Sequence, residues 1–262
     1  MSLNPKVADR QSNSHLRRDE ILLPQEIESI TRTTILTSGH INAAQTMLWR
    51  QFPSIGGLFC TTLGASLSFP AAAGKWLQIL HSGTDHWLLA ASGFEADHVV
   101  IYDSLNFQNA TRQHVLCCIS SLVKTKEKQM RYIVKSCQRQ ENGYDCGVFA
   151  IAFATSVAFG QDPSTIVYDT KLLRKHLVNC LKKGIIDLFP VTAAVRSSRC
   201  SREKIAVCNV YCHCRRTAHN NMSENFESLD CSRCKDKFHR MCDSPLPTTK
   251  QARKKWLCKN CR

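Results

Sequence analysis

The sequence lacks a long hydrophobic run. Its most apolar stretch, residues 148–159, is interrupted by Thr155 and Ser156 and is shorter than the ~20 residues that a membrane-spanning helix needs. The first twenty residues are polar and lack the apolar core of a secretory signal. We therefore expect an intracellular protein with no membrane contact and a disordered segment over residues 1–21.

Acidic residues are also scarce. The chain has 21 Asp and Glu against 35 Lys and Arg, which gives a formal net charge of +14. The imbalance is largest from Arg196 onward, where sixteen basic residues stand against six acidic ones. A basic tail favours acidic partners, so the sequence predicts a weak nucleic-acid contact there.

Cysteine is the residue that the chain has in excess. In a reducing compartment, fifteen cysteines indicate metal ligands, a reactive thiol and buried thiols more than disulfides. Seven of them lie between Cys212 and Cys261, and the other eight are scattered over the preceding chain. We predict one domain over residues 22–190, a basic linker over 191–207 and a small cysteine-rich domain over 208–262.

The pattern of apolar residues in the larger domain mixes helices and strands. Strands are expected where short aliphatic and aromatic runs are bounded by turn residues, and helices where apolar residues recur at helical spacing. The expected helices are residues 39–51, 110–123, 146–159 and 169–183, and the expected strands are residues 75–82, 86–92, 98–105 and 130–138. This layout predicts an α+β fold.

Cys146 stands directly before the apolar run that we expect to form a helix. A single cysteine in this position is most often a core residue. A helix N-terminus also favours the thiolate form, so Cys146 is a candidate nucleophile. Other residues of the same domain decide between these two interpretations.

Three other residues have the chemistry that a cysteine protease requires. His86 begins one expected strand and Asp103 ends the next, so an antiparallel pairing would bring them together. Gln140 lies six residues before Cys146, in a loop from which its amide could donate to an oxyanion.

The motifs HW at His86, YDS at Asp103 and Q-x-N-G-x-D-C-G from Gln140 resemble the Ulp-type cysteine proteases, which process ubiquitin-like proteins. The resemblance covers about residues 25–190. It implies a papain-like fold of the Ulp and adenain type, with Cys146 as nucleophile, His86 as general base and acid, Asp103 as its orienting partner and Gln140 as oxyanion donor. It also implies cleavage of a peptide or isopeptide bond after the C-terminus of a ubiquitin-like protein or a similar small-residue site, with no cofactor for catalysis.

The same resemblance implies a narrow substrate groove with Trp87 as one wall. The family usually has a tryptophan in a W-L-x-D segment as the second wall. Here Ile35 takes the place of that tryptophan and Ser38 that of the acid. The sequence therefore supports catalysis better than it supports specificity for SUMO.

Four ligand pairs fill the cysteine-rich tail. Eight Cys and His ligands in pairs suit two tetrahedral zinc ions with no open position, which are structural sites. The order of ligands resembles a PHD finger, which implies a cross-brace between alternate pairs. The implied ligands are Cys212, Cys214, His239 and Cys242 for one zinc ion and Cys231, Cys234, Cys258 and Cys261 for the other.

Cys208 and His213 are left over as a non-ligating thiol and a surface imidazole. Since an aromatic cage for methyl-lysine is not evident, the finger is expected to bind an unmodified histone tail or to dock another protein. The pairing of a Ulp-like protease with a PHD finger resembles proteases encoded by eukaryotic transposons, and it implies a nuclear or nucleocytoplasmic location. The alternative is a catalytically inactive adaptor for chromatin or proteins that keeps the protease fold.

Overall fold

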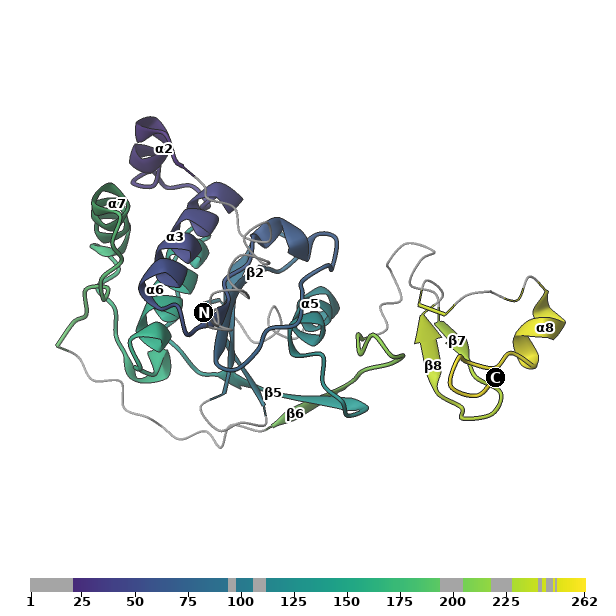
Figure 1. Cartoon of the computed structure of the whole chain (residues 1–262). Coiled ribbons are helices and arrows are strands. Elements are labelled where there is room, and N and C mark those ends of the chain that lie inside the picture. The colour runs from purple at the N-terminus through teal and green to yellow at the C-terminus, as the bar shows by residue number, and fades with distance from the viewer. Residues whose placement is uncertain are drawn as a thin grey trace, which may run out of the picture.

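The computed structural model describes residues 21–93, 98–105, 112–193, 205–217, 228–239, 242–243, 247 and 249–262. Residues 1–20 of the predicted disordered segment and most of the predicted linker lie outside the described residues. Figure 1 shows a larger body, built on a sheet with helices on both sides, followed by a smaller cysteine-rich body. Within the described residues, no helix has the length and apolar character needed to cross a membrane.

A mixed sheet forms the centre of the larger body. Its strands lie side by side in chain order: β1 (Gly56–Gly57), β2 (Trp76–His81), β3 (Trp87–Ser92), β4 (Val99–Tyr102), β5 (Gln129–Lys135) and β6 (Ala206–Asn209). Strands β2, β3 and β4 pair antiparallel, and β5 runs parallel to β4. The antiparallel pairing expected for the two strands beside His86 and Asp103 is therefore present.

Helices cover both faces of this sheet (Figure 1). On one face are α3 (Ser38–Gln51), α6 (Cys146–Ala158) and α7 (Leu173–Lys183), with the short α2 (Pro24–Ser29) beside α7; on the other is α5 (Gln113–Val123). Side chains of β2 alternate between the faces, as strand geometry requires. Leu77 and Ile79 join the core under α6, while Trp76 and Leu80 join the core under α5. Two 3-10 turns, Thr61–Gly64 and Pro163–Thr165, complete this body.

The helix boundaries differ from the predicted ones where a side chain binds the backbone. Helix α3 has Thr37 as its N-cap, since the Thr37 hydroxyl accepts a hydrogen bond from the His40 amide. Helix α7 begins at Leu173 and not at Asp169. The Asp169 carboxylate accepts a hydrogen bond from the Lys171 amide and so holds a turn before the helix.

The segment after the predicted linker belongs to the sheet of the larger body. Strand β6 pairs antiparallel with β5, and the predicted boundary at residues 207 and 208 falls inside it. Val210 is 2% exposed and lies in the core under α5. Thr217 is also buried, and its amide donates to the Ser120 hydroxyl on α5. Residues 206–217 thus join the two bodies.

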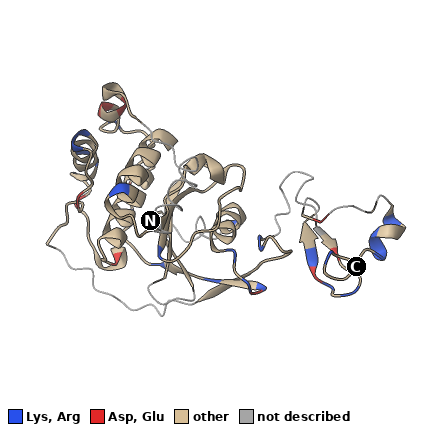
Figure 2. Cartoon of the chain, in the orientation of Figure 1, with Lys and Arg blue, Asp and Glu red and all other residues tan. Residues whose placement is uncertain are grey.

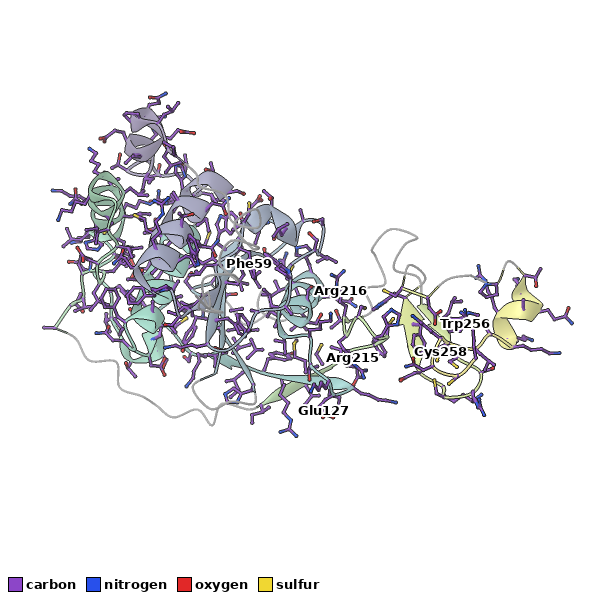
Figure 3. All side chains as sticks on the ribbon, viewed as in Figure 1. Phe59, Glu127, Arg215, Arg216, Trp256 and Cys258 are labelled. Carbon is purple, nitrogen blue, oxygen red and sulfur yellow. The ribbon has the colours of Figure 1, made fainter. Side chains whose placement is uncertain are left out.

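The cysteine-rich body has little regular structure. Strands β7 (Ser228–Asp230) and β8 (Lys237–His239) form a two-stranded sheet, and α8 (Lys250–Lys254) follows. Phe238 and Trp256 meet edge to face at 5.6 Å in its small core. Figure 3 shows Trp256 beside Cys258, and Arg215 and Arg216 at the junction with the larger body.

We predict that replacement of Val210 by alanine lowers the stability of the full chain by about 1–3 kcal/mol, because it leaves a cavity in the core under α5. Calorimetric unfolding would measure the change. Val207→Ala is the matched control, since Val207 lies in β6 and is 50% exposed. Equal effects of the two substitutions would show that this segment does not contribute to the core.

Candidate active site

One edge of the sheet brings together the four residues predicted to carry catalysis. His86 precedes β3 and Asp103 follows β4, so their antiparallel pairing places both at the same edge. The end of β5 lies at this edge too, because β5 runs parallel to β4, and the loop with Gln140 follows it. Cys146 is the first residue of α6, which packs on β3.

His86 and Asp103 form a buried ion pair. Nε2 of His86 lies 2.7 Å from Oδ1 of Asp103, and the two residues are 3% and 7% exposed. The Leu105 amide donates to the same carboxylate oxygen at 2.8 Å. The thiol of Cys137 donates to the Asp103 carbonyl at 3.0 Å. The carboxylate is therefore held in one orientation toward the imidazole.

The surroundings of His86 favour its protonated form. Burial lowers the pKa of the imidazole, but the hydrogen bonds to Asp103 and Cys146, together with their negative charges, raise this pKa to about 9. His86 therefore carries a proton at neutral pH, in contact with the thiol of Cys146. An imidazolium beside a cysteine at a helix N-terminus is the arrangement that supports a reactive thiolate.

Close packing of Gly147 against the Leu36 side chain holds Cys146 beside the segment that precedes α3. A side chain at Gly147 would place its Cβ 2.9 Å from Cβ of Leu36, so only glycine fits there. The Leu36 carbonyl accepts a 2.8 Å hydrogen bond from the indole of Trp87. Ile35 is partly buried against the same core. The two predicted groove residues, Trp87 and Ile35, thus lie close to the N-terminus of α6.

Gln140 has its side-chain amide fixed at both ends. Its Oε1 accepts from the Ser104 hydroxyl at 2.7 Å, and its Nε2 donates to the Asn142 carbonyl at 2.6 Å. The backbone N–H of Gln140 also donates to the backbone carbonyl of Ser104 at 2.8 Å. A primary amide has two N–H groups, so one donor remains beyond the bond to Asn142.

Sequence reasoning missed three residues that hold this site, namely Ser104, Asn142 and Arg174. Asn142 stands in the turn signal Asn-Gly, and its side chain accepts from the amides of Tyr144 and Asp145. The only indication of Ser104 in the sequence is its position next to Asp103. Arg174 lies about thirty residues away on α7, and nothing in its local sequence indicates its contacts.

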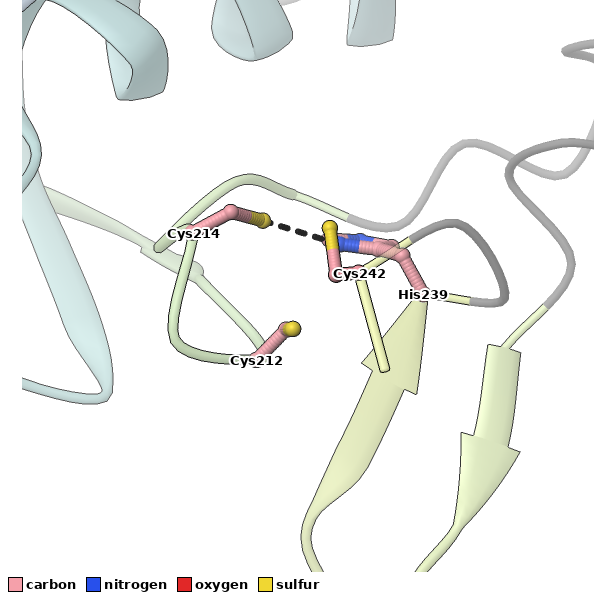
Figure 4. Close-up of side chains that lie close together, drawn as sticks. All are labelled: Cys212, Cys214, His239 and Cys242. Atoms are coloured by element: carbon pink, nitrogen blue, oxygen red, sulfur yellow. Dashed lines mark hydrogen bonds between the residues drawn. The ribbon is translucent and has the colours of Figure 1, made fainter. Parts of the chain in front are cut away.

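The cysteine-rich body contains two groups of four ligand atoms, and in each group all four atoms lie within 4.8 Å of one another. One group is Cys212, Cys214, His239 and Cys242, whose side chains point toward one another in Figure 4, and the other is Cys231, Cys234, Cys258 and Cys261. These two groups are the same two ligand sets that the resemblance to a PHD finger implies, one for each zinc ion.

The donor chemistry and spacing of these groups fit a tetrahedral metal ion. Two thiolates on one zinc ion, each at about 2.3 Å, stand about 3.8 Å apart. Sγ of Cys234 and Sγ of Cys258 are 3.9 Å apart, much farther than a disulfide bond allows. Cys208 belongs to neither group and packs against the core under α5, and His213 is exposed.

Basic residues gather on the cysteine-rich body and on the neighbouring end of the β5–β6 pair, as Figure 2 shows. Lys128 and Lys237 there pair with Asp236 and Asp230 at 3.3 and 3.5 Å. Part of the positive charge is therefore neutralised locally.

Comparison with known proteins finds similarity to one family of protease domains. Residues 77–188 match the model of the Ulp1 protease family, C-terminal catalytic domain. The structure of the SUMO protease Ulp1 with its catalytic cysteine oxidised to a sulfenic acid is 16% identical; the match covers 70% of this chain and 96% of that chain, with a TM-score of 0.54. The Ulp1 protease domain in complex with Smt3, the yeast ortholog of SUMO, is 17% identical; the match covers 70% and 97%, with a TM-score of 0.50.

No curated protein matches the chain. The structural likeness nevertheless confirms the predicted α+β fold of the Ulp type for the larger body.

We predict that NMR titration of the histidines finds His86 with a pKa of about 9, and that Asp103→Asn lowers this pKa because it removes the negative charge that stabilises the imidazolium. In the wild type the ring is protonated below pH 9 and neutral above it. The variant His86→Gln assigns the signal by removing it. An unchanged titration in Asp103→Asn would contradict the role of this pair.

Proposed function

The chain carries a cysteine peptidase domain of the Ulp1 protease family, and from this we propose that it hydrolyses a peptide or isopeptide bond after the C-terminus of a ubiquitin-like protein. The observation that carries the proposal is the buried pair of His86 and Asp103, 2.7 Å apart, in contact with a cysteine at the N-terminus of α6. This arrangement provides a nucleophile, a proton carrier and an orienting carboxylate in one place.

In the proposed reaction, the Cys146 thiolate attacks the scissile carbonyl and forms a carbon–sulfur bond. The carbonyl electrons move to oxygen, where the remaining N–H of Gln140 donates to the oxyanion. As the carbon–nitrogen bond breaks, the imidazolium of His86 gives its proton to the leaving amine. Water then attacks the thioester carbonyl while His86 accepts one of its protons. The carbon–sulfur bond breaks, the Cys146 thiolate is restored, and the released carboxylic acid loses its remaining proton to solvent.

The proposed substrate class follows from the residues packed around the N-terminus of α6 and from the relatives. The solved Ulp1 domain was captured with Smt3. In this chain, Trp87 is fixed by its hydrogen bond to Leu36, and residues 35–36 pass close to the catalytic helix. Trp87, Leu36 and Cys146 are all buried, so the space beside the thiol is narrow, and we propose that it admits a chain end of small residues. Ile35, in place of a tryptophan, makes the second wall less planar, so we propose a broader tolerance at this position.

The cysteine-rich body is proposed to be a PHD finger with two structural zinc ions, held by the two groups of four ligands. When bound, zinc would supply the cross-links that such a small core lacks. We propose that the finger binds a histone tail or docks another protein, and that its basic residues add a weak nucleic-acid contact. A nuclear or nucleocytoplasmic location would follow from these partners.

One observation favours a second candidate function. The thiol of Cys146 is 0% exposed, so a substrate has to displace neighbouring side chains before it can react. A domain in which that movement no longer occurs would be an inactive adaptor that only binds chromatin or proteins.

Electrophilic probes on the C-termini of SUMO, ubiquitin and related proteins distinguish the two candidates. We expect the full chain to form a covalent adduct with at least one probe, and Cys146→Ala to abolish it. Gln140→Ala should slow adduct formation by about 10²-fold, the effect of losing one oxyanion donor. A folded wild-type chain that forms no adduct with any probe and cleaves no conjugate would establish the adaptor instead.

Elemental analysis is expected to find two zinc ions per chain, and Cys231→Ser to reduce the content to about one, since a tetrahedral site tolerates the loss of a thiolate poorly. Cys208→Ser is the matched control, because Cys208 lies outside both groups, and it should keep both ions. A zinc content that stays the same in Cys231→Ser would exclude the proposed cross-brace.

A further inference from the structure

Arg174 has an unusually complete set of hydrogen bonds. It lies in the first turn of α7, and an arginine guanidinium carries five N–H donors in a fixed plane. All five have an acceptor at 2.6–2.9 Å. The acceptors are Oδ1 of Asp145 and the backbone carbonyls of Ile30, Arg32, Thr34 and Tyr144.

These acceptors belong to two segments that are distant in the sequence and that both end at the active site. Residues 30–34 lead directly to Ile35 and Leu36, and the Leu36 carbonyl holds the indole of Trp87. Tyr144 and Asp145 lead directly to Cys146. One side chain therefore ties the proposed groove wall to the start of the catalytic helix.

The network continues from Arg174 to the proposed oxyanion donor. Oδ2 of Asp145 accepts a hydrogen bond from the Asn142 side chain at 2.7 Å, and the Asn142 carbonyl accepts from Nε2 of Gln140 at 2.6 Å. The guanidinium also lies over the ring of Tyr144, 5.1 Å from its centroid. Each of these contacts constrains the loop from residue 140 to 145.

Burial makes this network strong. The side chains of Arg174 and Asp145 are 12% and 10% exposed, and Nε lies 2.6 Å from the carboxylate. A charge with so little access to water is stable only when its donors are satisfied, which the five acceptors achieve. Loss of the guanidinium would leave the Asp145 carboxylate with the Asn142 side chain but without its charged partner, and the part-buried carbonyls of Ile30 and Tyr144 without this donor.

We propose that Arg174 is a positioning residue for the peptidase reaction. It does not touch the reacting atoms, but it fixes the loop with Gln140 and the segment of residues 30–36 in one arrangement before the substrate binds. The oxyanion donor and the proposed groove wall are then already in place relative to Cys146 when the substrate arrives. This role depends on the proposed peptidase function, whereas the structural coupling that it requires can be measured without any activity.

A lysine cannot take this place. Its ammonium group has three donors and no planar fork, so it cannot serve five acceptors around one plane. Arg174→Lys keeps the charge and the helix but removes at least two hydrogen bonds, and Arg174→Gln also removes the charge. Lys175→Gln is the matched control, because Lys175 is the exposed neighbour of Arg174 on α7.

The first experiment uses kinetics in the full chain. We expect Arg174→Lys and Arg174→Gln to slow acylation by a ubiquitin-like probe or substrate by about 10²-fold, through a lower kcat, because the reacting groups are displaced. Alkylation of Cys146 by iodoacetamide needs no oxyanion donor, so it should change by less than about fivefold. Lys175→Gln should behave as the wild type. Equal losses in acylation and alkylation, or no loss, would overturn the proposal.

The second experiment is hydrogen–deuterium exchange of the same proteins. Arg174→Lys should speed exchange in residues 30–36 and 140–146 together, while the strands β2–β4 remain as protected as in the wild type. Faster exchange in only one segment, or throughout the larger body, would overturn the coupling. If the wild type shows no peptidase activity but the exchange result holds, the proposed function fails while the coupling stands.

Discussion

The packing of α6 against the central sheet is the contact on which the rest of the structure depends. The helix is apolar on all sides, and its side chains from Val148 to Val157 are buried between β2 and β3 on one side and α3 and α7 on the other. Each large side chain, such as Phe149 or Phe153, contributes ~1.5–3 kcal/mol when it leaves water. This packing fixes the position of Cys146, because Cys146 is the first residue of α6.

The chemistry of the site comes from placing charge at the edge of that core. His86, Asp103, Asp145 and Arg174 are all largely buried, and each is stable there because it has a partner. Both ion pairs lie near the N-terminus of α6, since His86 contacts Cys146 and Asp145 directly precedes it. One bears on the proton carried by His86, and the other holds the loop that precedes the nucleophile. In both pairs the side chains have little contact with water, so their stability depends on the distance and orientation of the partner.

The cysteine-rich body is less separate from the peptidase domain than its composition indicates. Strand β6 extends the sheet, Val210 fills the core under α5, and Thr217 binds Ser120. Cys212 and Cys214 lie between these two anchored residues. One of the two ligand groups is therefore attached to the domain that carries the active site, so the orientation of the finger is tied to the sheet.

The sequence by itself determined the elements and the chemistry that depends on local patterns. Short apolar runs bounded by turn residues predicted β2–β5, helical apolar spacing predicted α3, and a nearly continuous apolar run predicted α6. The motifs around His86, Asp103 and Cys146 indicated a thiol protease, and the paired cysteines, with their resemblance to a PHD finger, implied the two ligand groups. Tertiary structure alone decided what depends on distant backbone atoms. The role of Ser104, the pairing of β6 with β5 and the five bonds of Arg174 have no local signal, because their acceptors are carbonyl groups or side chains brought near only when the sheet and helices pack.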